Sequence, residues 1–463
     1  MTVRILAVGA AAPALRLDAA DVGAAWDRGG RGTVAVCGAD EDTLTLAWEA
    51  TTRALDAAGL APDAIDALHW GTSRPPFAEG PSLAFLAAAI GCDSRVGGSL
   101  HAGSPHSGME ALLGASDAVA AGSARIAVVV VSDAVRPGPG TGFEARCGAG
   151  AAAFVLAAEG GAGELGPRVT RTRPFVDRYR GDGENDNRDL YDARLFREEI
   201  FLPIVGEVID ALATLAPTAW SLPDPDGRLG KVVAGRAGAG APASAAVYAA
   251  VGDTGAAAAL LGAAAAMDAA GTVAVVGTGG GRTTGVLLHL DGPVSGAART
   301  ADVLGGGRPT SYSRTLRVRG QLTATGETVP MGVPPESAMF VRGADEMLGL
   351  LGGRCQDCGT VSTPPSIHPA CIACGGPKLE PVAVARAGTV HTYVVNHTMP
   401  APFEAPLGIA VLDMDDGARL MLQVAGDGSD LAIGTRVTLV LRKYAHERGI
   451  PVYGFKARPE VTP

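Results

Sequence analysis

Residues 112–131 read LLGASDAVAAGSARIAVVVV, and residues 260–276 read LLGAAAAMDAAGTVAVV. Each stretch begins with the same Leu-Leu-Gly-Ala tetrapeptide, continues as an Ala-rich segment typical of a short helix, and ends in a β-branched run after a glycine. A Gly-rich turn and a second apolar run follow each stretch. Two copies of one helix and strand unit indicate a duplicated domain, although a sequence so rich in Ala and Gly also produces similarity by chance.

The chain around this repeat alternates Ala-rich and β-branched segments from residue 1 to about 295. The additional β-branched runs include Ala151–Leu156 and Gly285–Leu290. Helical segments that alternate with strand segments are typical of a layered domain. We therefore predict an α/β fold for this part of the chain.

Composition and charge limit the classes of function. The 463 residues exceed what one hydrophobic core usually organises, and 47% apolar with 19% charged residues indicates a globular protein. The net charge of -10, without any cluster of Lys or Arg, argues against a nucleic-acid partner. The apolar stretch Thr254–Met267 is too short to cross a membrane. We expect a cytoplasmic protein with no nucleic-acid and no membrane partner.

Four of the seven cysteines form two Cys-x-x-Cys pairs, and twelve residues separate the pairs. The four cysteines are Cys355, Cys358, Cys371 and Cys374. Each pair allows two thiolates to bind one tetrahedral ion at about 2.3 Å. Because four thiolates leave no position for water, we predict a structural Zn²⁺ ion. A redox-active pair is the alternative.

Composition changes again after residue 300. Residues 301–340 are rich in Gly, Arg, Thr and Pro without periodicity, which predicts a linker. We assign residues 341–380 to a short helix and a zinc ribbon. Residues 381–463 hold short strand segments separated by turns, which predicts a small closed β-barrel. The strand segments are Thr389–Asn396, Gly408–Asp413, Arg419–Val424, Thr435–Arg442 and Val452–Lys456.

The first 295 residues resemble the thiolase-like superfamily, nearest to its hydroxymethylglutaryl-CoA synthase and ketoacyl synthase III branches. Short motifs carry the resemblance: Gly38–Asp42, His69–Ser73, Ser107-Gly108 with Ala111-Leu112, Gly148–Ala152 and Val251–Gly255. Residues 341–463 resemble the zinc-ribbon plus OB-fold domain that accompanies thiolase-like proteins in acyl-CoA metabolism. The motifs there are both cysteine pairs, Gly388–Val390 and Val452–Lys456.

The resemblance implies a duplicated thiolase-like layered fold (α-β-α-β-α), followed by a small zinc ribbon and an all-β OB barrel. We expect the two thiolase-like halves at residues 1–165 and 166–300. The resemblance also implies an acyl thioester substrate, carried by CoA or by the phosphopantetheine of an acyl carrier protein. It further implies a homodimer formed through the first half, and it suggests an acyl carrier protein or a partner subunit as a second partner.

The family's catalytic pattern is broken at the nucleophile. Family chemistry begins with a cysteine at a helix N-terminus, where the helix dipole and unsatisfied amides lower the pKa of the thiol. The matching position, seven residues before Leu112, is Pro105, and no cysteine lies between Cys92 and Cys147. Ser104, with His106 as its base, is the alternative nucleophile. The loss of the thiol argues against Cys-dependent condensation.

The second half departs from the family in the same way. Pro223 stands where the family has a histidine, and Asp253 stands where it has an asparagine or a histidine. By the repeat, Asp253 and Pro105 should face each other. We predict that Asp253 and His106 are acid–base residues of an enzyme that makes or breaks a carbon–carbon bond of an acyl thioester without a covalent intermediate.

Two other functions stay open at this point. The thiolase-like half could have lost catalysis and serve as a scaffold or binding subunit for a partner enzyme, or it could be an acyltransferase that uses Ser104. We expect Arg442 and Lys443 in the barrel to contact CoA phosphates. Their surroundings hold too few basic residues for the single-stranded nucleic-acid binding that other OB folds perform.

Overall fold

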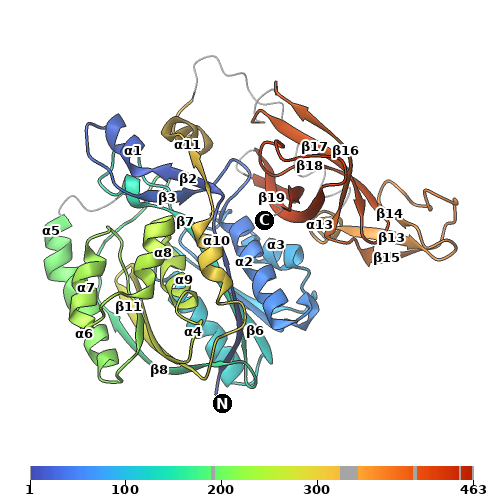
Figure 1. The fold of residues 1–463 in the computed structure, drawn as a ribbon. Coiled ribbons are helices and arrows are strands. Elements are labelled where there is room, and N and C mark those ends of the chain that lie inside the picture. Colours follow the sequence, from blue (N-terminus) through green and yellow to red (C-terminus); the bar gives the residue numbers. More distant parts are fainter. Residues whose placement is uncertain (1, 189–192, 324–342, 400–403, 448–449, 461–463) are drawn as a thin grey trace. The chain divides into compact units, whose positions relative to one another are not determined.

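The computed structural model describes residues 1–463 except residues 1, 189–192, 324–342, 400–403, 448–449 and 461–463 (Figure 1). The chain separates into two compact units. Unit 1 consists of Met1–Leu83 and Cys92–Leu322, and unit 2 consists of Ala84–Gly91 and Thr323–Pro463. Among the described residues, none of the helices combines the length and the apolar character that crossing a membrane requires.

Unit 1 mixes strands and helices along its whole length. Its strands are β1 (Arg4–Ala11), β2 (Leu15–Asp18), β3 (Thr33–Val36), β4 (Ala67–Thr72), β5 (Gly97–Ala102), β6 (Ile126–Ala134), β7 (Ala149–Ala157), β8 (Gly163–Thr172), β9 (Ala219–Ser221), β10 (Gly271–Gly279), β11 (Arg282–Leu290) and β12 (Arg308–Thr310). Its helices are α1 (Ala19–Ala25), α2 (Thr43–Ala58), η1 (Pro62–Ala64), α4 (Ser107–Ala120), η2 (Glu144–Arg146), α5 (Ala193–Leu195), η3 (Phe196–Phe201), α6 (Leu202–Ala213), α7 (Leu229–Ala237), α8 (Ala243–Val251), η4 (Gly255–Ala257), α9 (Ala258–Ala264), α10 (Arg299–Gly305) and α11 (Tyr312–Val318). Most of α3 (Ser82–Ile90) belongs to unit 2.

A nine-stranded sheet contains the predicted duplication. Its strand order is β5-β4-β6-β7-β1-β8-β11-β10-β9. In the first half β4 pairs parallel with β6, and β6 pairs antiparallel with β7. In the second half β9 pairs parallel with β10, and β10 pairs antiparallel with β11. Helices α4 and α9 precede β6 and β10 at matching positions, so the repeat read from the sequence is confirmed.

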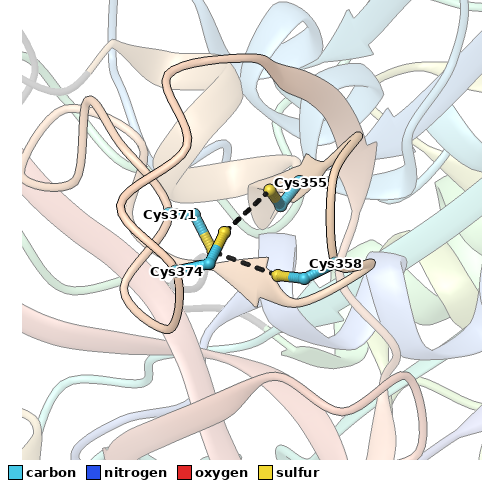
Figure 2. Close-up of side chains that lie close together, drawn as sticks. All are labelled: Cys355, Cys358, Cys371 and Cys374. Carbon is cyan, nitrogen blue, oxygen red and sulfur yellow. Dashed lines mark hydrogen bonds between the residues drawn. The ribbon is translucent and has the colours of Figure 1, made fainter.

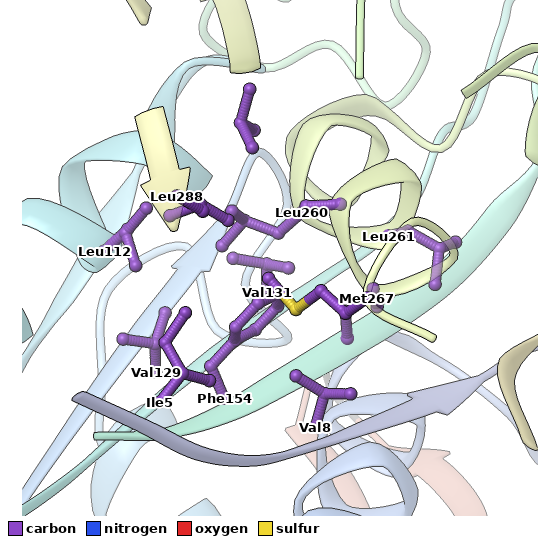
Figure 3. Close-up of a cluster of buried hydrophobic side chains, with 14 of the residues drawn as sticks. Ile5, Val8, Leu112, Val129, Val131, Phe154, Leu260, Leu261, Met267 and Leu288 are labelled. Carbon is purple, nitrogen blue, oxygen red and sulfur yellow. The ribbon is translucent and has the colours of Figure 1, made fainter. Parts of the chain in front are cut away.

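The side chains of β10 show how the layers are built. Val273 and Val275 point into a buried cluster with α4 and α9, which Figure 3 shows. Ala274 and Val276, on the opposite face, join a second cluster formed with α6 and α7. Because successive residues of a strand face opposite sides, one strand covers both layers. Strand β10 is therefore buried on both faces, with α4 and α9 on one side and α6 and α7 on the other.

Helix α2 begins and ends where its sequence predicts. Asp42 accepts the backbone N–H of Leu44 and Thr45, and the Thr45 hydroxyl accepts the N–H of Asp42, which completes a capping box. Gly59 ends the helix with a φ of 65°, a conformation that glycine adopts without strain. The Gly38–Asp42 motif thus positions the first long helix.

Residues 299–322 carry regular structure within unit 1. Strand β12 pairs parallel with β2, and Ser311 caps α11 by accepting the N–H of Arg314. Tyr312 is buried in a cluster with side chains of β2, β3 and α1. The sequence predicts a linker from residue 301, but these short elements are held by tertiary contacts that composition does not reveal. The rest of the predicted linker, residues 324–340, lies outside the described residues.

Unit 2 contains a small sheet and a barrel. Its elements are α13 (Ala344–Leu348), β13 (Leu351–Cys355), β14 (Val361–Ser362), β15 (Leu379–Ala383), β16 (Ala387–Asn396), β17 (Leu407–Met414), β18 (Arg419–Gln423), β19 (Arg436–Glu447) and β20 (Ile450–Pro459). Strands β14-β13-β15 form the small sheet, and β18-β17-β16-β19-β20 form an antiparallel sheet. Val424 bridges Ala457 of β20, which brings the two edges of this sheet together into a nearly closed barrel.

The fold class is therefore as predicted: a duplicated, layered α/β core, followed by a small three-stranded sheet and an all-β barrel. The domain limits given above stay predictions.

Candidate functional site

The elbow is the turn Gly103–Ser107, which joins β5 to α4. Pro105 precedes His106, the residue at the start of α4. Ser104 N–H donates to Ser107 Oγ (3.3 Å), His106 N–H donates to Ser104 Oγ (3.2 Å), and Ser107 N–H donates to the Ser104 carbonyl (3.1 Å). Proline has no N–H to offer. Residues 104–107 therefore present neither a thiol nor an unpaired amide that could stabilise an oxyanion.

The His106 ring forms a histidine–carboxylate pair inside unit 1. It is 0% exposed, and its Nε2 lies 2.8 Å from Thr284 Oγ1 on β11. Its Nδ1 lies 3.4 Å from Glu110 Oε1, an ion-pair distance rather than a well-aligned hydrogen bond. The nearby His106 ring, and more weakly the Arg282 guanidinium that also contacts Glu110, lower the pKa of this carboxyl group. Glu110 lies one helical turn after His106, so the sequence contained this signal, but our sequence analysis missed it.

Ser104 is not brought to the His106 ring. In the part of the chain that the structure describes, the polar contacts of that ring go to Thr284 and Glu110, and none goes to Ser104. The Ser104 hydroxyl accepts a backbone N–H at the helix start instead. This arrangement does not activate Ser104, and its role as a nucleophile stays a prediction without support from the contacts.

Asp253 is the centre of a second polar cluster, in the loop between α8 and η4. It is 7% exposed. Arg178 Nη1 donates to Asp253 Oδ2 at 2.7 Å, and Gly255 N–H donates to Asp253 Oδ1 at 3.0 Å. Its backbone is fixed as well, because the carbonyl accepts the N–H of Gly148 at 2.8 Å. The predicted carboxylate is thus held in place by both its side-chain and its backbone contacts.

The predicted face-to-face arrangement of Pro105 and Asp253 is not a direct contact. A Cβ on Gly279 would lie within 3 Å of the Pro105 ring, which shows that the elbow packs against the end of β10. The second-half loop meets α4 through its backbone, since a Cβ on Gly108 would lie 2.1 Å from the Ala256 carbonyl oxygen. The N-terminal ends of α4 and η4 therefore approach each other through their backbones. The polar side chains near them form two separate clusters, one around His106 and one around Asp253.

Tyr248 and Asp224 belong to the Asp253 cluster, and the sequence analysis missed both. The Tyr248 hydroxyl lies over Gly227, where a Cβ would be 2.8 Å from it. Burial and the carboxylates of Asp253 and Asp224 raise the pKa of Tyr248, and burial raises the pKa of Asp224. Asp224 Oδ1 is shielded from solvent without a hydrogen-bond partner. Asp224 directly follows Pro223, the position where the family has a histidine. Its carboxylate was not among the predicted site residues.

A buried aspartate joins the two halves near these clusters. Asp133, at the end of β6, accepts the N–H groups of Ser73, Ala134 and Ala256. Complete burial raises the pKa of Asp133. Because its hydrogen bonds come from both halves, Asp133 holds η4 against the end of β6.

The four cysteines of the two pairs come together in unit 2 (Figure 2). Their Sγ atoms all lie within 4.8 Å of one another, with 3.6 Å between Cys355 and Cys374 and 3.5 Å between Cys358 and Cys371. Thiolates about 2.3 Å from one tetrahedral ion stand about 3.8 Å apart. A hydrogen bond with Thr360 lowers the pKa of Cys358 to about 6. The cluster therefore fits a tetrahedral metal ion.

Matching backbone turns position these thiols. Gly359 N–H donates to the Cys355 carbonyl, and Gly375 N–H donates to the Cys371 carbonyl, each at 2.9 Å. Both glycines have positive φ, 76° and 71°. Such a turn needs glycine and places the two sulfurs of a pair on one side.

Arg442 and Lys443 lie next to each other on β19 with different exposure. Arg442 is 6% exposed and donates to the Leu441 carbonyl, whereas Lys443 is half-buried. The burial of Arg442 does not favour a contact with a phosphate in solution. The phosphate-binding role of the two residues stays a prediction.

Comparison with known proteins gives a family model and curated relatives. Residues 381–442 match a model described as the ChsH2 C-terminal OB-fold domain. A DUF35 domain-containing scaffold protein of Methanocaldococcus jannaschii is 35% identical over 116 residues, which are 24% of this chain and 81% of that protein. A hydroxymethylglutaryl-CoA synthase of Pyrococcus furiosus is 33% identical over 156 residues, 33% of this chain. The match spans 45% of the synthase, about half its length.

Solved structures agree on the fold. MvaS in complex with 3-hydroxy-3-methylglutaryl coenzyme A superimposes with a TM-score of 0.60 at 18% identity, covering 72% of this chain and 94% of that one. An HMG synthase of the curacin biosynthetic pathway, in complex with an acetyl donor acyl carrier protein, has a TM-score of 0.58 at 15% identity and covers 69% and 88%. The core of this chain thus shares the thiolase-like fold of these solved structures.

Proposed function

We propose that this chain makes or breaks a carbon–carbon bond of an acyl thioester without a cysteine nucleophile. The chain belongs to the DUF35 domain family, and it has a thiolase-like α/β core ahead of its barrel. One observation carries the proposal. The elbow at the start of α4 reads Ser104-Pro105-His106 and contains no thiol, while polar side chains cluster behind it. Proton transfer, rather than acyl transfer to the protein, is the chemistry that these residues fit.

The reaction we propose is cleavage of a β-hydroxyacyl thioester, or its reverse. Asp253 accepts the proton of the β-hydroxyl group, and the bond between Cα and Cβ breaks. Its electron pair forms the enolate of the shortened thioester, and the β-carbon leaves as a ketone or an aldehyde. The proton on Asp253 then passes to Cα, which regenerates the carboxylate. The step is balanced without an oxidant or a reductant.

The surroundings of Asp253 support this assignment. Arg178 and the Gly255 N–H hold the Asp253 carboxylate in one orientation, as a positioned acid–base group requires. The raised pKa of Tyr248 keeps its hydroxyl protonated at neutral pH, which suits a donor to the enolate oxygen. His106 is the second proposed acid–base group because Glu110 pairs with its ring as in catalytic histidine–carboxylate pairs.

A scaffold or binding function is the second candidate, and a specific observation favours it. The His106 ring is completely buried, and one relative of the chain is named a scaffold protein. A side chain that cannot be reached does not transfer protons to a substrate. On this alternative, the polar clusters stabilise the thiolase-like core and the barrel region binds a partner subunit.

The remaining parts of the proposal concern ligands and assembly. We propose a structural Zn²⁺ on the four cysteines, and a thioester carried by CoA or by an acyl carrier protein. Four thiolates persist in a reducing compartment, which supports a cytoplasmic location. The homodimer through the first half is proposed from the thiolase-like resemblance.

Turnover of synthetic β-hydroxyacyl-CoA esters tests the proposal. The full chain is incubated with secondary and tertiary β-alcohols of different chain lengths, and the shortened acyl-CoA and the carbonyl product are quantified. We expect Asp253→Asn and His106→Gln to lose about 10²- to 10⁴-fold in rate, as for the loss of an acid–base group. Asp268→Asn, an exposed carboxylate after α9, is the matched control and should keep full activity.

Two results would contradict the proposed reaction. Undiminished turnover by Asp253→Asn removes this residue from the mechanism. Stable acyl label on Ser104 or Cys147, after incubation with radiolabelled acyl-CoA and acid precipitation, replaces it with an acyltransferase mechanism. If the wild-type chain cleaves none of the esters but binds a partner enzyme, the scaffold function stands.

A further inference from the structure

Arg319, just after α11, has a buried and unpaired guanidinium nitrogen. Its Nη1 is shielded from solvent, and among the described residues no hydrogen bond or ion pair reaches the guanidinium. Burial lowers the pKa of Arg319. Arg319 as a residue is half-buried, but a charged donor atom that is shielded from water without a partner is costly. The structure therefore lacks an acceptor at this point.

Neighbouring carboxylates do not supply that acceptor. Glu144 acts on Arg319 electrostatically, but its two oxygens accept hydrogen bonds from other donors. Tyr312 Oη donates to Glu144 Oε1 at 2.6 Å, and Gly140 N–H donates to Oε2 at 2.7 Å. Among the described residues no hydrogen bond or ion pair joins Glu144 to Arg319, and Glu144 instead holds Tyr312 of α11.

Gln321 adds a second unpaired polar atom close by. Its Nε2 donates to the Pro137 carbonyl at 2.7 Å, which turns the amide toward the segment after β6. Its Oε1 is shielded from solvent and has no hydrogen-bond partner. Two positions apart in the chain, Arg319 Nη1 thus offers an unpaired donor and Gln321 Oε1 offers an unpaired acceptor.

More positive charge surrounds the site than the chain's composition suggests. Arg136 is close enough to Arg319 to lower its pKa further. Burial, with the like charges of Arg180 and Arg136, lowers the pKa of Arg74 to about 10. Asp186 pairs with Arg136 at 2.6 Å and compensates only part of this charge. In a chain of net charge -10, this local excess attracts anions.

We propose that Arg319, Gln321 and Arg136 form a binding site for an oxyanion of the thioester ligand, either a carboxylate on the acyl group or a phosphate of its carrier. Arg319 Nη1 donates to the anionic oxygen, and Gln321 Oε1 accepts from a hydroxyl or amide N–H of the same ligand. That the ligand is a thioester rests on the proposed function. That the site takes an oxyanion rests on the unpaired atoms and the neighbouring arginines, and not on the proposed reaction.

Four ligands in a two-by-two design distinguish the two sources of the oxyanion, the acyl carboxylate and the carrier phosphates. Glutaryl-CoA, valeryl-CoA, S-glutaryl-pantetheine and S-valeryl-pantetheine differ only in a terminal carboxylate and in the carrier phosphates. Titration calorimetry with the full chain measures their affinities. We expect at least a tenfold preference for ligands that carry one of these anions, following the carboxylate if the acyl group is bound and the phosphates if the carrier is bound.

Two substitutions, one in α11 and one just after it, test whether Arg319 causes the preference for anionic ligands. Arg319→Met should abolish the preference and leave the affinity for S-valeryl-pantetheine unchanged. Arg317→Met, which changes an exposed arginine of α11, is the control and should keep the preference. An equal loss of affinity for all four ligands in Arg319→Met, or no preference in the wild type, overturns the proposal.

Thermal unfolding provides a readout that does not depend on the thioester. Inorganic phosphate at millimolar concentration should raise the Tm of the wild type but not that of Arg319→Met. Without phosphate, Arg319→Met should not be less stable than the wild type, because it removes an unpaired buried charge. A lower Tm with unchanged phosphate protection identifies Arg319 as a structural residue and contradicts the site. No turnover is measured, so this failure is distinct from failure of the proposed reaction.

Discussion

The cysteine cluster of unit 2 and the polar clusters of unit 1 are built over very different distances along the chain. The sulfur contacts join residues 13 and 19 positions apart. The His106 ring meets Thr284 across 178 positions, Glu110 meets Arg282 across 172, and Arg178 meets Asp253 across 75. The first site is specified by its local sequence, whereas the other two exist only after the sheet has formed.

This difference decides what holds each site in place. Turns with glycine at positive φ bring the cysteine pairs together, and the ion proposed above would add the energy that a small sheet of three short strands lacks. The polar clusters need no ion, because burial between α4, β11 and the second-half loop fixes their side chains. Removing one ligand should therefore unfold the first site, and removing one hydrogen bond should only weaken the second.

The largest effect is expected in the cysteine cluster. Cys371→Ser should reduce bound zinc from about one ion per chain to almost none and unfold β13, β14 and β15, because structural zinc contributes about 10–16 kcal/mol in zinc-finger peptides. Elemental analysis measures the metal, and hydrogen exchange measures protection of the three strands. Cys92→Ser, outside the cluster, is the control. Full zinc content in Cys371→Ser would show that the four sulfurs do not act as one site.

A smaller effect is expected at the long-range contact of His106. Thr284→Val removes the Oγ1 that lies 2.8 Å from His106 Nε2 and leaves a buried ring nitrogen unpaired, which should destabilise unit 1 by about 1–3 kcal/mol. The four tryptophans, at positions 26, 48, 70 and 220, all lie in unit 1, so their fluorescence in urea follows this unit alone.

The matched control for that change is another buried threonine. Thr51 on α2 has a shielded Oγ1 without a hydrogen-bond partner. Thr51→Val should therefore leave the stability of unit 1 unchanged or raise it slightly, since it removes an unsatisfied polar atom. If both variants are equally stable, the contact between His106 and Thr284 contributes nothing, and burial alone explains the position of the ring.

Much of the fold could be predicted because its signals are local or periodic. The repeat predicted both helix and strand pairs, and the alternation of strand segments after residue 381 predicted β16–β20. The cysteine spacing predicted the cluster for the same reason. The short elements β12 and α11 were missed, since seven-residue helices are stabilised by packing, here of Tyr312 beneath α1 and β2, and not by composition.

The candidate site could be predicted only in part. Pro105, His106 and Asp253 follow from motif positions, so their places in the chain were available. Their partners were not, because Arg178 and Tyr248 come from a loop and a helix with no pattern that marks them. Sequence periodicity tells which face of an element is buried, but it does not tell which buried side chains meet across the core.

The smallest expected effect is the pH dependence of the Glu110 contact. Since His106 lowers the pKa of Glu110 in the folded state, the folded protein holds fewer protons here than the unfolded chain as the pH falls. The resulting stability is fully present above the unfolded pKa of Glu110 and is lost as the pH falls through the folded pKa. Glu110→Gln should therefore flatten the acid limb of unit 1 stability below about pH 4.5, while Glu79→Gln, exposed before α3, should leave it unchanged. Tryptophan fluorescence during urea unfolding at several acidic pH values measures the stability of unit 1 in the wild type and in each variant. If the stability of the wild type and of Glu110→Gln falls identically as the pH is lowered, the ion pair with His106 does not stabilise unit 1. The contact of His106 with Thr284 would then be the long-range contact of this ring that contributes to stability.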